Sequence, residues 1–193
     1  MKALGLDPSS TAFGAAMVEL LGDTERERQR KEAGAWLDGK VLRWWLFEGK
    51  YPRSLESKAA SLHALLGRLV ECFREARRLG VSIIAYEMPP QWKRRGMGFR
   101  HCQEGVILVA YNEVFGQDEA KPGIVAIDPN KWARTMLNCA SPGREARKRL
   151  AVERAAQRLG FETGSDDVAE AALIALYALL EARVKAITEK RRG

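Results

Sequence analysis

Four carboxylates are the residues of this sequence with the clearest potential for chemistry: Asp7, Glu87, Asp167 and Glu170. Asp7 directly follows residues 2–6, a short and mostly apolar run whose side chains alternate as in a strand. Glu87 ends residues 81–86, an apolar run typical of a strand buried on both faces. The other two acids open a helix so rich in Ala, Leu and Ile over residues 171–182 that most of its surface must be buried.

Carboxylates gathered from three separate core elements would repel one another unless a cation lay between them. Magnesium ions take carboxylate oxygens and keep positions for water and phosphate, and Mn²⁺ can substitute. Two such ions stabilise the attacking water and the leaving oxygen of an in-line phosphodiester hydrolysis. We therefore expect the four acids to be metal ligands and catalytic residues, with two Mg²⁺ per active site.

The last helix leaves one choice of ligand open. Glu170 lies three residues after Asp167 and four after Asp166, so it can share a face with either. Asp166 and Asp167 differ by about 100° of rotation around the helix axis, so both cannot face one site equally. Either could also be a first-turn acid that interacts only with the helix dipole.

The basic residues point to a polyanionic partner. The chain has 32 Lys and Arg against 25 Asp and Glu, for a net charge of +7, and 21 of the basic residues are arginines. Arginine suits bidentate contacts with phosphate. Basic residues concentrate in a flexible loop over residues 91–100 and in an amphipathic helix over residues 144–158. We expect the DNA contacts to come from Trp92, Lys93, Arg94, Arg95, Phe99, Arg100, Lys131, Arg147 and Lys148.

The two aromatic residues of the basic loop, Trp92 and Phe99, allow two interpretations. Beside so many cations they could stack on DNA bases or wedge between them. Both could equally be core residues that fix the loop to the domain.

The first half of the chain reads as an antiparallel meander of about three strands followed by a helix. Ala3 and Gly5 lie on the same strand face as Asp7 and are too small to fill a core, so another element must approach the sheet closely there. The expected elements are a hairpin turn at residues 8–12, a strand over 13–20, a solvated charged loop or strand extension over 22–34, strands within 35–48 turned at Asp38-Gly39, and a helix from Ser54 to Gly80.

The second half alternates strands and helices. Asp128 should cap the start of a helix with Pro129 at its first position. Ser141 and Pro142 should start the next helix in the same way. The expected elements are a helix over 102–114 that stops at Gly116, a strand over 124–127, the two helices just described and the final helix over residues 165–182.

Length and composition limit the class of protein. A chain of 193 residues, 46% hydrophobic, suits a single domain over residues 1–193, with a short basic tail from about residue 185. No apolar run is long enough for a membrane span and no secretory signal pattern is present, so we expect a cytoplasmic protein with no membrane partner. Three dispersed cysteines and two histidines argue against a disulfide framework or a structural zinc.

The order of elements and motifs resembles the ribonuclease H-like fold, and in particular the RuvC group of Holliday junction resolvases. Residues 4–10 (LGLDPSS) are similar to the group's opening Gly-Ile-Asp-Pro-Gly-Ser, and Gly14 to its later glycine. Residues 84–87 (IAYE) resemble its second acidic strand end, and residues 167–171 (DVAEA) its closing Asp-x-x-Asp-Ala. The resemblance covers nearly the whole chain and favours Asp167 over Asp166 as the partner of Glu170.

The resemblance implies an α/β fold with a mixed five-stranded sheet flanked by helices. It also implies a homodimer that binds four-way DNA junctions and nicks two opposing strands with magnesium, without a nucleotide cofactor. Ser9 and Glu170 depart from the group's usual Gly and Asp. Such divergence favours an enzyme encoded by a phage or mobile element over a housekeeping enzyme.

Three alternatives remain at the level of sequence. Another nuclease of the same fold, acting on RNA-DNA hybrids or other branched DNA, would carry similar acids. A non-catalytic relative that only binds junctions would keep the fold without supporting cleavage. Sugar and acetate kinases of the actin-like fold open with a similar hairpin, but 193 residues leave no room for the second domain that closes over ATP.

Overall fold

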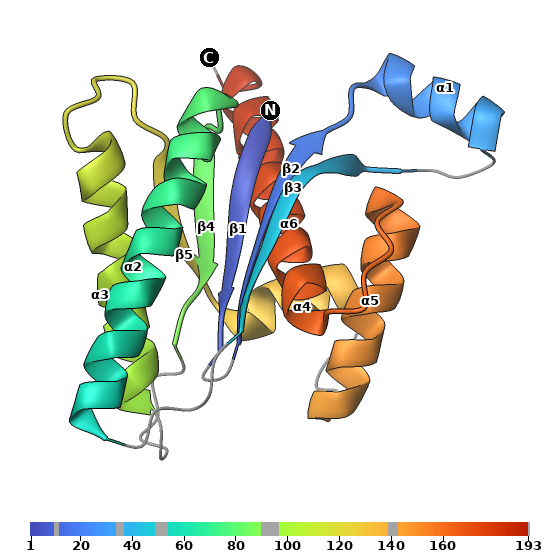
Figure 1. Ribbon diagram of the computed structural model, residues 1–193. Coiled ribbons are helices and arrows are strands. Elements are labelled where there is room, and N and C mark those ends of the chain that lie inside the picture. The colour runs from blue at the N-terminus through green and yellow to red at the C-terminus, as the bar shows by residue number, and fades with distance from the viewer. Residues whose placement is uncertain (10–11, 34–36, 49–53, 90–96, 139–142, 193) are drawn as a thin grey trace.

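Figure 1 shows the computed structural model, in which a five-stranded sheet has the order β3-β2-β1-β4-β5. β1 (Lys2–Pro8), β2 (Ala12–Leu20) and β3 (Gly39–Glu48) form an antiparallel meander, and β4 (Ile83–Glu87) and β5 (Gly123–Ile127) continue from β1 as parallel strands. The predicted mixed five-stranded sheet is confirmed. The structure describes residues 1–9, 12–33, 37–48, 54–89, 97–138 and 143–192.

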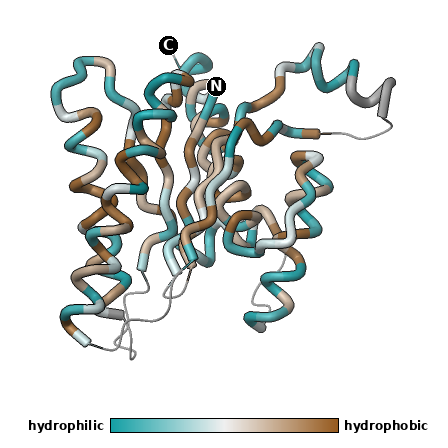
Figure 2. Tube along the Cα trace, viewed as in Figure 1, coloured by the Kyte–Doolittle hydropathy of each residue, from teal (hydrophilic) through white to brown (hydrophobic). Residues whose placement is uncertain are grey.

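Helices cover both faces of the sheet (Figure 1). α2 (Leu55–Arg78) and α3 (Met97–Phe115) enclose one hydrophobic core against the first face. α4 (Pro129–Leu137), α5 (Arg144–Leu159) and α6 (Asp166–Lys190) enclose a second core against the other. Figure 2 shows hydrophobic residues along the strands and the covering helices. None of the helices in the described part of the chain is long and apolar enough to cross a membrane.

α6 lies directly against β1 and β2, because two glycines leave room for its backbone. A Cβ atom added at Gly5 would lie 2.0 Å from the carbonyl oxygen of Ala171, and one added at Gly14 would lie 2.1 Å from that of Asp167. Real Cβ atoms do not come this close to a backbone oxygen. The expectation that another element approaches the small-residue face of β1 is therefore confirmed, and that element is α6.

The charged segment after β2 differs from the prediction. Residues 22–34 were expected as a loop or strand extension, but Asp23–Ala33 forms helix α1, which extends beyond the sheet in Figure 1. The segment lacks an apolar face, yet Glu, Arg, Gln and Lys are all good helix formers and their charges alternate in sign. Contacts near its start tie it to β3, since Lys40 Nζ lies 3.5 Å from Glu25 Oε1.

Three smaller predictions also need correction. Asp38-Gly39 is not a hairpin turn, because α1 precedes it and β3 begins at Gly39. The cap residue of α5 is Gly143, while the predicted cap at Ser141-Pro142 lies outside the described residues. The basic stretch from residue 185 is not a separate tail, since α6 continues through Lys190.

Candidate active site

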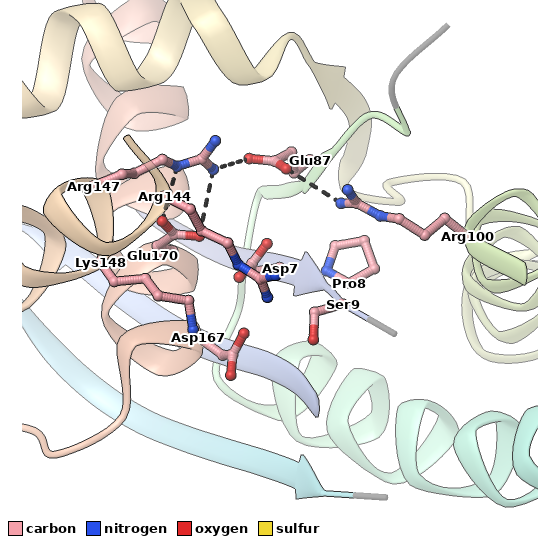
Figure 3. Close-up of a pocket in the computed structure, with 10 residues that line it drawn as sticks. All are labelled: Asp7, Pro8, Ser9, Glu87, Arg100, Arg144, Arg147, Lys148, Asp167 and Glu170. Carbon is pink, nitrogen blue, oxygen red and sulfur yellow. Dashed lines mark hydrogen bonds and ion pairs between the residues drawn. The ribbon is translucent and has the colours of Figure 1, made fainter. Parts of the chain in front are cut away.

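The four predicted acids line one pocket of about 450 Å³ at the end of the sheet where β1 and β4 finish. Asp7 comes from β1, Glu87 from β4, and Asp167 and Glu170 from the first turns of α6 (Figure 3). Basic side chains enter the same pocket from α3 and α5. The full lining is Asp7, Pro8, Ser9, Glu87, Arg100, Arg144, Arg147, Lys148, Asp167 and Glu170.

Asp7 is almost fully buried and lies among other negative charges. Its side chain is 4% exposed, opposite Gly14 in the β1–β2 ladder and beneath α6. Burial is the main cause that raises the pKa of Asp7 well above its usual value, and the negative charges of Glu170, Glu87 and Asp167 raise it further. The carboxylates are thus close enough to disfavour each other's ionisation.

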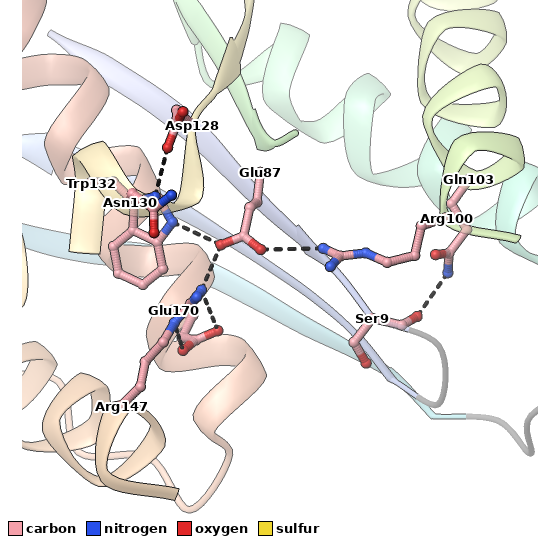
Figure 4. A network of polar contacts seen from close by, with 9 residues as sticks. All are labelled: Ser9, Glu87, Arg100, Gln103, Asp128, Asn130, Trp132, Arg147 and Glu170. Atoms are coloured by element: carbon pink, nitrogen blue, oxygen red, sulfur yellow. Dashed lines mark hydrogen bonds and ion pairs between the residues drawn. The ribbon is translucent and has the colours of Figure 1, made fainter. Parts of the chain in front are cut away.

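Glu87 accepts hydrogen bonds from three side chains on three different helices (Figure 4). Arg100 Nη2 on α3 donates to Oε1 at 3.2 Å. Arg147 Nη2 on α5 and Trp132 Nε1 on α4 both donate to Oε2, at 2.6 Å and 2.8 Å. The strand-end carboxylate is therefore fixed in orientation although it is almost fully buried, at 4% exposed.

Arg147 bridges two of the acids. Its Nε donates to Glu170 Oε1 at 2.9 Å while its Nη2 contacts Glu87, as the dashed lines in Figure 3 show. Partial burial lowers the pKa of Arg147, but the charges of Glu87 and Glu170 outweigh it and raise that pKa overall. Burial also raises the pKa of Glu170, whereas Arg147 lowers it. The guanidinium of Arg147 therefore offsets negative charge on both carboxylates.

The two aspartates at the start of α6 have different surroundings. Asp166 forms an ion pair with Lys148 and does not line the pocket. Asp167 lines the pocket and shares a hydrogen bond with the Ser9 side chain, and burial together with the charge of Asp166 raises its pKa. Of the two registers open at the level of sequence, the geometry favours Asp167 with Glu170.

The donor set suits a hard divalent cation. Carboxylate oxygens are the ligands that magnesium prefers, and Asp7, Glu87, Asp167 and Glu170 would hold it here. Among the described residues, no three acids, histidines or cysteines already stand close enough together to hold a metal ion. The guanidinium of Arg147 lies between two of the four, so it marks a position that attracts positive charge.

The structure brings only part of the predicted DNA-contact set to this pocket. Arg100 and Arg147 contact acids rather than extending freely from a loop or helix surface, and Lys148 is paired with Asp166. Lys131 is exposed on α4. The predicted contacts at Trp92, Lys93, Arg94 and Arg95 lie outside the described residues.

Phe99 requires a correction. It was placed in a flexible loop, but α3 already begins at Met97 and the Phe99 side chain is 7% exposed. A ring at that depth is part of the core, which was the alternative interpretation of this residue.

Three residues around the acids were missed at the level of sequence. Trp132 lies in the helix predicted after Asp128 but was not singled out, and Arg144 was one of many basic residues in its helix. Gln103 Nε2 donates to the backbone oxygen of Ser9 at 2.9 Å and so holds the turn after Asp7 (Figure 4). A glutamine inside a helical pattern gives no signal of such a distant contact.

The sequence matches no protein-family model and no curated protein. Solved structures do resemble this one. Thermus thermophilus RuvC matches with a TM-score of 0.69 and 18% identity, covering 96% of this chain and 97% of that one. RuvC of the same organism in complex with a Holliday junction substrate matches with a TM-score of 0.66 and 18% identity over 95% and 96% of the two chains. The yeast mitochondrial Holliday junction resolvase Ydc2 matches with a TM-score of 0.51 and 13% identity over 90% and 77%. The chain therefore has the ribonuclease H-like fold of these resolvases.

Proposed function

We propose that this protein is a metal-dependent endonuclease that resolves four-way DNA junctions by hydrolysing phosphodiester bonds. The observation that carries the proposal is the convergence of four carboxylates from β1, β4 and α6 in one pocket that four basic side chains also line. Burying several carboxylates side by side is electrostatically unfavourable, and such clusters of perturbed acids are typical of functional sites. The fold shared with known junction resolvases supports the choice of substrate.

Each group in the pocket has a role in this proposal. Bound Mg²⁺ would supply a nucleophilic water and stabilise the charge that develops on the leaving oxygen. Asp7, Glu87, Asp167 and Glu170 would hold the metal. Arg144 and Arg147 line the same pocket and would contact the phosphates on either side of the cut.

A homodimer belongs to the same proposal. Resolution requires two nicks at symmetric positions, and a two-fold pair of active sites provides a fixed separation between them most simply. The exposed apolar side chains of Leu108 and Val109 on α3, at 41% and 54%, support the segment from Cys102 to Val109 as the interface.

The test compares three labelled substrates in parallel: a synthetic four-way junction, a linear duplex of the same sequence and an RNA-DNA hybrid. Each is incubated with Mg²⁺ or with Ca²⁺, which is expected to support binding without cleavage. We expect paired nicks in opposing strands of the junction with Mg²⁺ and little cleavage of the duplex. Asp7→Asn should abolish nicking while junction binding survives, because the lost charge is a metal ligand and not a DNA contact.

The alternatives give different results in the same assay. Preference for the hybrid, or equal cleavage of the linear duplex, would assign the chain to another activity of this fold. Junction binding with no cleavage under either metal would identify a non-catalytic junction-binding protein.

A further inference from the structure

Glu87 is held by donors of two chemical kinds. Arg100 and Arg147 carry positive charge, and their side chains are 22% and 25% exposed. Trp132 is neutral and fully buried, and its Nε1 donates to Glu87 Oε2 at 2.8 Å. Figure 4 shows the indole and the two guanidinium groups approaching the carboxylate from different sides.

The position of Trp132 is fixed by its helix. Asp128 caps α4, with Oδ1 accepting from the backbone nitrogen of Asn130 at 2.7 Å, and Pro129 occupies the first turn. Trp132 is among the largest fully buried side chains of the protein. A donor on such an element cannot move away without displacing the core.

The two kinds of donor respond differently to a metal ion. A divalent cation that approaches Glu87 repels both guanidinium groups, which are exposed enough to turn toward solvent or DNA phosphate. The indole N–H has no net charge, so it can keep its hydrogen bond when the cation arrives. Hydrogen bonds to ligating carboxylates of this kind set metal affinity, and their loss costs about 10–100-fold.

We propose that Trp132 is the positioning residue of the metal site, holding Glu87 Oε2 so that Oε1 is presented to the metal when the arginines leave. This inference rests on the proposed metal-dependent function. Trp132 also contacts one of the two arginines, since the guanidinium carbon of Arg147 lies 4.8 Å from the centre of its ring.

The test separates the N–H donor from the ring. Trp132→Phe keeps an aromatic side chain in the core but removes the donor, and Glu87 still has its arginine partners. Trp44→Phe is the matched control, because Trp44 is 52% exposed on β3 and packs near Phe161, away from the pocket lining. Mg²⁺ affinity is measured by calorimetry without DNA, and nicking is measured as a function of Mg²⁺ concentration.

We expect Trp132→Phe to weaken Mg²⁺ binding about tenfold. The Mg²⁺ concentration for half-maximal nicking should rise by the same factor, while the rate at saturating Mg²⁺ changes by less than about threefold. Trp44→Phe should match the unaltered protein in both measurements. Unchanged Mg²⁺ affinity in a folded Trp132→Phe protein would overturn the inference, and so would a lower maximal rate at unchanged affinity.

A second substitution covers the case in which phenylalanine does not fill the core. 3-Benzothienylalanine at position 132 keeps the two-ring shape and replaces the N–H by sulfur, and the same two outcomes apply to it. Failure of the broader proposal is distinguishable, because the unaltered protein would then bind no Mg²⁺ and nick no junction. If the unaltered protein binds Mg²⁺ and nicks junctions, and neither substitution at position 132 changes this, only the role of Trp132 is refuted.

Discussion

At the scale of single residues, Asp7 combines burial with three neighbouring negative charges, and its raised pKa has a direct consequence for stability. The folded protein holds a proton that the unfolded chain releases above a pKa of about 3.9. The stability from this group is therefore fully present below the unfolded pKa and is lost as the pH rises through the raised folded pKa. Without metal, ionised Asp7 destabilises the fold at high pH.

We predict that Asp7→Asn melts at a higher temperature than the unaltered protein at pH 8 in a chelator, because the neutral amide avoids burying a charge. The gain should shrink as the pH is lowered, since Asp7 is then protonated. Each 1 kcal/mol of stability corresponds to about 2–4 °C in a protein of this size. Thermal melts from pH 5 to pH 8 check this, and a lower melting temperature for Asp7→Asn at pH 8 would contradict it.

The two aspartates of α6 allow a prediction about ligand register. Glu170→Gln should abolish Mg²⁺-dependent nicking and Asp167→Asn should reduce it nearly as strongly, because both side chains line the pocket. Asp166→Asn should cost tenfold or less, about 1.4 kcal/mol, because Asp166 is paired with Lys148. Single-turnover nicking rates decide between them. An inactive Asp166→Asn protein beside a normal Asp167→Asn protein would show that the register is wrong by one residue.

The acids could be predicted from sequence while their partners could not, for a physical reason. Strand ends and first helical turns are local patterns, so Asp7, Glu87 and Glu170 stand out within a few neighbouring residues. The contacts of Glu87 with Trp132 and Arg147 join positions 45 and 60 residues apart. Nothing in the spacing of a tryptophan inside an amphipathic helix identifies a carboxylate on a distant strand.

At the scale of elements, the close contact of α6 with the β1–β2 hairpin controls where the acids of the helix lie. Gly14 faces the backbone of Asp167 with no room for a Cβ atom. Any side chain at this position must push the start of α6 away from the sheet. Asp167 and Glu170 would then move away from Asp7.

We predict that Gly14→Ala destabilises the protein by about 1–3 kcal/mol, the usual cost of overpacking. It should also reduce nicking more than the remaining folded fraction explains, because the proposed metal ligands are displaced. Gly67→Ala is the control, since Gly67 lies in α2 with nothing within 4 Å of an added Cβ, and it should stabilise by about 0.5–1 kcal/mol. Urea unfolding and nicking rates test both, and normal nicking by Gly14→Ala would contradict the prediction.

The elements themselves were predicted well where apolar periodicity was strong, as in α2 and β4. The prediction failed at α1, whose residues bury no apolar face. Hydrophobic patterning carries no information about such a helix, and the intrinsic preferences of Glu, Arg and Lys were the only signal.

At the scale of the whole molecule, the proposed dimer can be tested through the exposed face of α3. Val109→Glu places a charge in the expected interface and should give a monomer by light scattering, with single uncoupled nicks in place of paired ones. Val184→Glu is the control, because Val184 is 62% exposed on α6 outside that interface and its replacement should leave a dimer. A monomeric unaltered protein, both free and with junction bound, would count against the dimer.

The placement of the last two acids on α6 also has a consequence for synthesis of the protein. Asp167 and Glu170 are made after Asp7 and Glu87, and α6 must then fold back onto β1 and β2. A nascent chain on the ribosome therefore has an incomplete set of ligands until about residue 170 has emerged and folded. Under the proposed function, the order of synthesis itself would keep an unfinished nuclease from acting on the nucleic acids around it.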